Sequence, residues 1–162
     1  YKISRISSFK TRKMIANGIF LSKIIYLIQV WGGCSDFLIN FLQVLQNKAA
    51  RSVTKLGWYT PVSVRQLTAY HSLNLIYKTK RDKKPRYFYE KFSTQFGYQT
   101  RFASGGTINT SGNISNKHLT QQSFLYKSTK QWNELPSEIR MEPTLTGFKR
   151  KAKLWIKSNV PI

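Results

Sequence analysis

The residues of this chain that could do acid–base chemistry are few. Glu134 and Glu138 stand four residues apart, a spacing that on a helix would put two carboxylates on one face. Pro136 lies between them and interrupts helical spacing, so they need not share a face. Two-metal nucleotidyl transfer needs clustered carboxylates, whereas the six acids of this chain are scattered. We therefore expect no catalytic residue here.

Candidates for metal binding and nucleophilic catalysis are equally sparse. The only cysteine is Cys34 and the two histidines are His71 and His118, without metal-ligand spacing. A thiol nucleophile needs a histidine and an orienting group, and Cys34 has neither nearby in sequence. The glycine pairs at 32–33 and 105–106 lack the Lys-Ser/Thr or third glycine of a phosphate-binding loop. The sequence thus predicts no metal and no cofactor.

Positive charge is the dominant chemical feature. Lys and Arg number 27 against six acids, which gives a formal net charge of +21. Self-repulsion at this density opposes compaction unless a polyanion neutralises it. Nucleic acid is the first candidate partner and an anionic membrane surface the second. A basic protein that carries charge only for solubility is the third interpretation.

Cysteine usage and hydropathy bear on location. One cysteine excludes an internal disulfide and fits a reducing, intracellular compartment, either nucleus or cytoplasm. The apolar segment 19–31 is too short to cross a membrane and contains Lys23. We expect it to be a buried core helix, the C-terminal part of a helix over 8–30, and we expect no membrane partner.

The second predicted helix runs from Ser35, a good N-cap, to Gly57, a helix stop. Its apolar residues fall on one stripe about 120° wide: Leu38, Phe41, Leu42, Leu45, Ala49, Val53 and Leu56. A third helix is predicted from Ser63 to about Lys78, because "SVRQ" has the capping-box form. A last helix is predicted over 146–158, with Leu145, Phe148, Ala152, Trp155 and Ile156 on one face.

Three groups of basic residues could contact phosphates. One flanks the second helix, one is the stretch 78–86, predicted as a phosphate-binding loop or linker, and one is a row at i, i+4 and i+8 of the last helix. Each could instead be a solvated face, but no acid pairs with the first group within its helix. The candidate nucleic-acid-binding residues are Lys48, Arg51, Lys55, Lys78, Lys80, Arg81, Lys83, Lys84, Arg86, Lys149, Lys153 and Lys157.

The most acidic stretch, "QWNELPSEIR" at 131–140, is predicted to be structural. Trp132 and Leu135 are expected to be apolar anchors at the end of a helix that starts near Tyr126, and Pro136 to end it. Asn133 is expected to satisfy local backbone groups. The glutamates are expected to neutralise nearby cations, namely Lys127, Lys130 and Arg140, with Glu138 or Glu142 facing the C-terminal lysine row.

These elements predict a mainly α fold in three parts. Residues 1–92 form a helical region, residues 93–119 a flexible connection rich in Gly, Ser and Asn, and residues 120–162 a small C-terminal helical extension. The aromatics at 87–92 could stack on bases, although core packing is the commoner role of such residues.

Three ordered stretches resemble a known family. The stretches are "FLSKIIYLIQVWGG" with "LQVLQNKAARSVTKL", then "SFLYKSTKQWNELPSEIR", then "FKRKAKLWIKSNVPI". In that order they resemble the C-terminal region of the polymerase of LINE-type non-LTR retrotransposons, downstream of the reverse-transcriptase palm. One departure is a shorter segment after Pro61, which looks like a deletion.

The resemblance implies a thumb-like helical bundle that helps to hold template RNA and primer. The polymerase carboxylates and their Mg²⁺ would belong to the palm, expected upstream of Tyr1, so this chain would be no enzyme by itself. Its partners would be RNA or an RNA/DNA hybrid and the missing palm. Two alternatives remain: a structural remnant that only packs on the palm, and an unrelated basic RNA- or DNA-binding protein.

Overall fold

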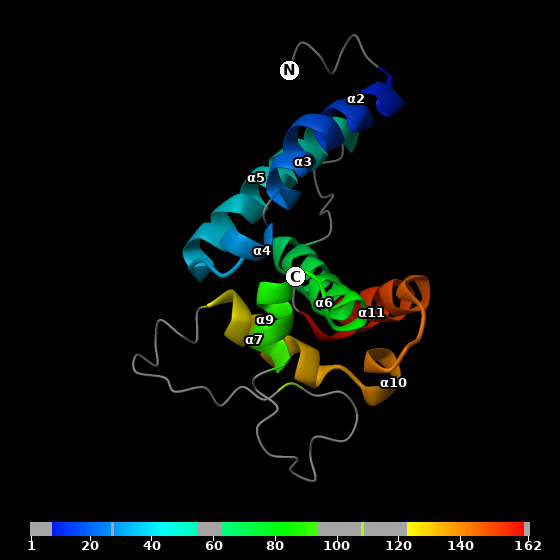
Figure 1. Ribbon diagram of the computed structural model, residues 1–162. Helices are drawn as coiled ribbons and strands as arrows, with labels where there is room; N and C mark the ends of the chain where they lie inside the picture. Colours follow the sequence, from blue (N-terminus) through cyan, green and yellow to red (C-terminus); the bar gives the residue numbers. More distant parts are fainter. Residues whose placement is uncertain (1–7, 27, 55–62, 94–107, 109–122, 161–162) are drawn as a thin grey trace.

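Figure 1 shows the computed structural model of the chain, in which helices dominate. It describes residues 8–26, 28–54, 63–93, 108 and 123–160. Within these ranges every regular element is a helix, which confirms the predicted mainly α class. Two lobes meet at one central helix, α6.

Among the described residues, the N-terminal lobe contains five helical segments. Ser8 caps the first of them by accepting a hydrogen bond from the Thr11 amide. The segments are α2 (Phe9–Ile15), the π-helical η1 (Ala16–Leu21), α3 (Ser22–Ile25), α4 (Ile28–Trp31) and α5 (Asp36–Thr54). The continuous helix expected over 8–30 is therefore interrupted, because Tyr26 adopts an extended conformation after α3.

The expectation that 19–31 is a buried core helix is wrong. Among the described residues of this segment, Ile24 and Ile28 are buried, whereas Ile19, Tyr26 and Val30 are exposed. Within the segment, η1 packs against α5 and α4 packs against α6. An apolar sequence becomes a core helix only where other elements cover it, and the described chain supplies no second layer here.

The predicted inner face of α5 is also wrong in its first half. Leu38 and Phe41 are exposed, and the buried residues are Ile39, Gln46 and Val53. These three lie seven residues apart, so they form one face, and α5 packs against η1, α2 and α6. Val53 is the member of the predicted stripe that is buried as expected. Three other members, Leu42, Leu45 and Ala49, are half-buried. Leu56 lies outside the described residues.

The C-terminal lobe is built around α6. Its elements are α6 (Val64–Asp82), α7 (Arg86–Ser93), α9 (Phe124–Glu134), α10 (Ser137–Arg140) and α11 (Leu145–Asn159). Phe148 near the start of α11 stacks on Tyr77 near the end of α6, with ring centroids 4.3 Å apart. At the other end, the Gln66 side-chain amide donates to the Val160 carbonyl at 2.9 Å. The two helices therefore run antiparallel.

The ends of α6 follow local chemistry. Ser63 is the N-cap, as predicted, and its hydroxyl accepts from the Arg65 amide at 3.1 Å. Gln66 does not complete a capping box, because its side chain reaches Val160 instead. The helix continues to Asp82, past the predicted end at Lys78, since Lys and Arg are good helix formers. It stops at Lys83, which is left-handed with φ 54°.

The main hydrophobic core joins α6 to residues on both sides of the predicted connection, most of which lies outside the described residues. Its buried members are Ala69, Leu73, Ile76, Tyr77, Phe92, Ile108, Trp132, Leu135, Phe148, Ala152 and Ile156. The anchoring roles expected of Trp132 and Leu135 are confirmed. The last helix is also confirmed within one residue at each end, with Thr144 as N-cap and Trp155 half-buried beside the core.

The aromatics of α7 belong to this core. Phe92 is buried, and Phe88 packs on the Phe92 and Phe124 rings. Only Tyr87 among them is largely exposed. The core role thus prevails over base stacking for Phe88 and Phe92.

Polar contacts join the lobes where α4 and α5 meet α6. Arg65 forms an ion pair with Asp36 at 2.9 Å, and the Val64 amide donates to the Gln43 side chain at 2.6 Å. The ammonium of Lys127 donates to the Gly33 carbonyl at 3.1 Å. A side chain at Gly32 would collide with Thr68, so glycine there lets α4 approach α6 closely.

Candidate nucleic-acid interface

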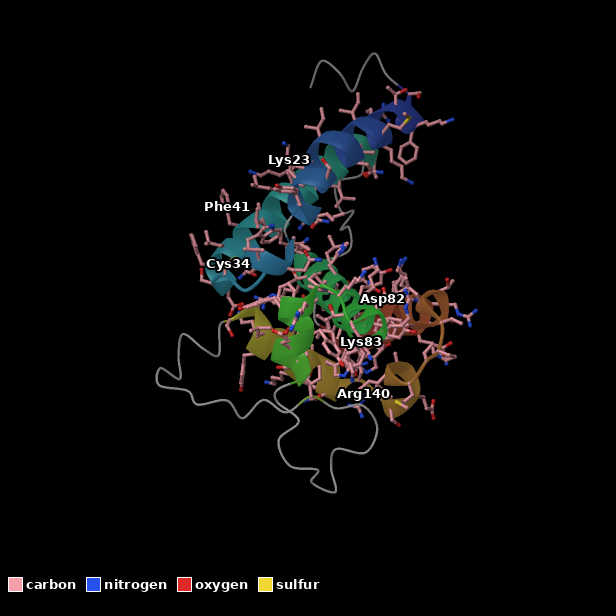
Figure 2. The ribbon with its side chains drawn as sticks, in the orientation of Figure 1. Lys23, Cys34, Phe41, Asp82, Lys83 and Arg140 are labelled. Atoms are coloured by element: carbon pink, nitrogen blue, oxygen red, sulfur yellow. The ribbon has the colours of Figure 1, made fainter. Side chains whose placement is uncertain are left out.

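The structure divides the predicted phosphate ligands between the two lobes. Lys48 and Arg51 lie exposed on α5 in the N-terminal lobe, and Lys55 is outside the described residues. The groups at 78–86 and 149–157 lie in the C-terminal lobe. Figure 2 shows Asp82 and Lys83 at the end of α6, far from Lys23 and Phe41 in the N-terminal lobe. The three groups therefore do not form one site.

The stretch 78–86 is not a loop, contrary to expectation. Residues Lys78 to Asp82 form the last turn of α6, and Arg86 begins α7. Only Lys83, Lys84 and Pro85 form the turn between the helices. The stretch is consequently held by two helices of the core, and Lys78, Lys83 and Lys84 are exposed on it.

Two arginines of this stretch already have acidic neighbours. Arg81 pairs with Asp82 at 2.7 Å, and Arg86 pairs with Glu90 at 2.6 Å. The Arg81 hydrogen bond lowers the pKa of the Asp82 carboxyl. Exposed pairs of this kind contribute only about 0–1 kcal/mol, so a phosphate could replace either carboxylate.

Lys80 has a different environment from its neighbours. Its ammonium lies over the Trp132 ring, 5.1 Å from the centroid, and the side chain is half-buried. Burial, helped by the charge of Arg140, lowers the pKa of Lys80 to about 8. Among the predicted phosphate ligands, Lys80 is therefore the one that covers the core.

The stability of the protein is expected to rise with pH where Lys80 titrates. Its folded pKa is about 8 against an ordinary value of 10.5, so the unfolded chain binds more protons between these pH values. After a discount for solvent screening, the gain is about 1–2 kcal/mol. Thermal melts should show this gain for the parent chain relative to Lys80→Met, which has no proton to lose.

Lys80→Arg is the matched control, because arginine stays charged across the window. It should lack the rise in stability and should remain less stable than Lys80→Met throughout. Parallel stability profiles for the parent chain and Lys80→Met from pH 7.5 to 10 would contradict the assignment.

The acids cannot neutralise the remaining cations. Four of the six acids form ion pairs in the structure: Asp36, Asp82, Glu90 and Glu142. The other two, Glu134 and Glu138, are exposed. Among the predicted ligands, the exposed cations that make no ion pair within the described residues are Lys48, Arg51, Lys78, Lys83, Lys84, Lys153 and Lys157.

The lysine row of α11 begins at Lys149, next to Phe148, which stacks on Tyr77 near the end of α6. Lys149 is half-buried, and Lys153 and Lys157 are exposed. No acid occurs on this helix. Six predicted phosphate ligands of the C-terminal lobe that make no ion pair in the part of the chain described are together called the C-lobe surface below: Lys78, Lys83, Lys84, Lys149, Lys153 and Lys157.

Three polar predictions for the acidic stretch need correction. Glu142 does face α11, but it bonds Lys151 at 2.5 Å, outside the predicted row. Asn133 bonds both backbone groups of the distant Ile108 instead of local groups. Arg140 donates to the Asn133 carbonyl at 2.9 Å, and Lys127 reaches Gly33. Both cations therefore donate to backbone carbonyls.

Sequence reasoning passed over three exposed cations of the N-terminal lobe. Lys10, Lys13 and Lys23 lie on α2 and α3. The signal that could have found them is the complete lack of acids before Asp36. The apolar residues of segment 19–31 favoured a prediction of burial in the core instead.

Other features of the lobes offer no site of comparable strength. A groove of about 180 Å³ lies between η1 and α5, lined by Phe20, Ala49 and Val53 among others, and it is smaller than typical ligand pockets. His71 is half-buried with its ring edge-on to Tyr70, and burial lowers its pKa. In the part of the chain that the structure describes, no three His, Cys, Asp or Glu residues are grouped to hold a metal, and no helix has both the length and the hydropathy to cross a membrane.

Comparison with known proteins adds no relative: no family model, curated protein or solved structure matches the chain. The likeness to retrotransposon polymerases thus rests on the sequence motifs. Function must be argued from the charge and geometry of the described residues.

Proposed function

We propose that this chain binds RNA or an RNA/DNA hybrid through the phosphate backbone, as the thumb-like C-terminal part of a LINE-type reverse transcriptase. The main support for the proposal is that most of the Lys and Arg side chains have no acidic residue to neutralise them, since the chain has 27 of these cations and six acids. Four of six acids are already paired, and the net charge is +21. A polyanion is the partner that such a surface favours.

The C-lobe surface has the rigidity that duplex positioning requires. Its lysines project from α6, the following turn and α11, and these helices share the core around Tyr77 and Phe148. From Lys149 to Lys157 the row extends about 12 Å along the helix axis. A duplex carries about one charge per 1.7 Å, so several phosphates can lie within reach of the row.

The proposed role is positioning and not chemistry. Contacts to phosphates fix the register and orientation of a duplex and carry no sequence information. Within the described residues no three His, Cys, Asp or Glu side chains are grouped, and the proposal gives no residue of this chain a metal-binding role. Nucleotidyl transfer would belong to the palm of the parent polymerase.

The salt dependence of binding tests the proposal. If the chain neutralises about six phosphates, the logarithm of affinity should fall with the logarithm of salt with a slope of about −4 to −5. Affinity should then drop by a factor of roughly 250 to 1,000 between 50 and 200 mM salt. Filter binding to RNA, duplex DNA and an RNA/DNA hybrid would measure the slopes, and a slope near zero would remove the proposal.

Paired variants locate the surface. Changing Lys153 and Lys157 to glutamine should reduce the slope by about two. The same change at Lys10 and Lys13 of the N-terminal lobe removes equal charge and should leave the slope nearly unchanged. Equal losses from both pairs would show that binding is spread over the whole chain and not centred on the C-lobe surface.

A further inference from the structure

Helix α5 exposes an apolar stripe on its outer side. Phe37, Phe41 and Val44 follow each other at spacings of four and three, and their exposed fractions are 77%, 54% and 50%. Two exposed cations, Lys48 and Arg51, continue the same spacing. The α5 stripe consists of Phe37, Phe41, Val44, Lys48 and Arg51.

The α5 stripe is one continuous face of the helix. At 3.6 residues per turn its five residues fall within an arc of about 80°. The buried residues Ile39, Gln46 and Val53 lie on the opposite side of the helix, against the rest of the lobe. Figure 2 accordingly shows Phe41 on the outer side of the lobe. Packing therefore fixes the stripe outward, and a small rotation of α5 cannot bury it.

The pattern of the stripe matches helix–helix packing. Alternating spacings of four and three residues are those of the inner positions of a coiled coil, where knobs of one helix enter holes of another. Two neighbouring phenylalanines and a valine on an outer face form a contiguous apolar patch, which marks an interface more than a scattered apolar residue does.

We propose that the α5 stripe docks one amphipathic helix of a partner protein. The partner helix carries apolar residues against Phe37, Phe41 and Val44, and acidic residues against Lys48 and Arg51. This inference is independent of the proposed nucleic-acid role of the C-lobe surface. It assigns carboxylates, in place of phosphates, as the ligands of Lys48 and Arg51.

Charge argues against a second copy of this chain as the occupant. In a parallel pair, Lys48 and Arg51 would face their own copies. In an antiparallel pair, the two cations would face Phe41 and Phe37. The chain has no acid on α5 beyond Asp36, so neither orientation supplies an acidic counterpart. The cations at the end of the stripe thus select a partner of opposite charge.

A designed helical peptide is the probe. It has roughly 20 residues, long enough for a helix to form on docking, with three leucines at stripe spacing followed by two glutamates. A scrambled peptide of equal composition controls for attraction to a +21 chain. Fluorescence anisotropy at physiological salt should show at least about tenfold tighter binding of the patterned peptide, as expected when apolar anchors are buried.

Substitutions on the full chain decide between docking and general attraction. Changing both Phe37 and Phe41 to serine should abolish the preference for the patterned peptide and leave the nucleic-acid salt slope unchanged. Both side chains are largely exposed, so circular dichroism should show an intact fold. An unchanged preference in this variant would overturn the inference.

Charge reversal tests the polar end of the stripe. Changing Lys48 and Arg51 to glutamate should weaken binding of the patterned peptide, and a peptide with lysines in place of its two glutamates should restore it. The same reversal at Lys153 and Lys157 is the matched control and should keep the preference. Two further results would overturn the inference: stripe-dependent dimers of the chain in sedimentation, or stripe-dependent binding to anionic lipid vesicles with no peptide preference.

Discussion

Replacing Trp132 with alanine is expected to lower the free energy of unfolding by about 3–5 kcal/mol. The indole is 1% exposed and packs against the Phe148 ring, with centroids 5.8 Å apart. It also lies beneath the Lys80 ammonium, so its loss leaves a cavity and removes the ring on which that half-buried charge rests. A domain's whole stability is about 5–15 kcal/mol, so urea denaturation should show a largely destabilised protein.

Glu134→Gln is the control for that substitution. Glu134 lies on the same helix two residues later, and it is exposed. Its change should alter the free energy of unfolding by no more than about 0.5 kcal/mol. If Glu134→Gln were as damaging as Trp132→Ala, or abolished a measurable activity, the acid-pair interpretation of Glu134 and Glu138 would return.

Replacing Asn133 with alanine is expected to cost about 2–4 kcal/mol. The Asn133 side chain accepts from the Ile108 amide at 2.9 Å and donates to the Ile108 carbonyl at 2.7 Å. Ile108 is buried in the core, so both backbone groups would lose their partner away from water. Each buried group left unsatisfied costs about 1–3 kcal/mol.

Urea denaturation measures this effect, and Gln131→Ala is its control. Gln131 is half-buried on the same helix, but it makes no hydrogen bond to Ile108. Its replacement should cost less than about 1 kcal/mol. Equal costs at both positions would show that the two hydrogen bonds to Ile108 contribute little to stability.

Features fixed by neighbours in sequence were predictable. Ser63 as an N-cap and the last helix with its face of Phe148, Ala152 and Ile156 depend on capping and periodicity, which are local. Trp132 and Leu135 are predicted as anchors because they are large apolar residues three positions apart at the end of a helix. These predictions needed no knowledge of the rest of the fold.

Features fixed by distant residues were not predictable. The apolar stripe predicts that Leu38 and Phe41 face inward, whereas the residues buried when α5 packs against η1, α2 and α6 are Ile39, Gln46 and Val53. The bond between Asn133 and Ile108 joins residues 25 positions apart, and no local pattern specifies it. Tertiary packing overrides amphipathic pattern when a helix is apolar on more than one side.

For the candidate nucleic-acid interface, the identity of the basic residues was likewise predictable, whereas their arrangement was not. The basic residues were evident from composition, but the sequence could not show that Lys80 covers Trp132 while Lys83 and Lys84 face outward. Nor could it show that Lys48 and Arg51 lie in a different lobe from the others. Charge is read residue by residue, whereas exposure depends on the completed fold.

The antiparallel pairing of α6 with α11 also determines when the core can form during translation. Tyr77 has its stacking partner only after Phe148 has been made. At about 5–20 residues per second, the ribosome adds the intervening residues, roughly 70, in about 4–14 s. For that time α6 is present in the nascent chain without α11, the helix that packs against it in the finished protein. During that interval the uncovered apolar face of α6 is prone to aggregation.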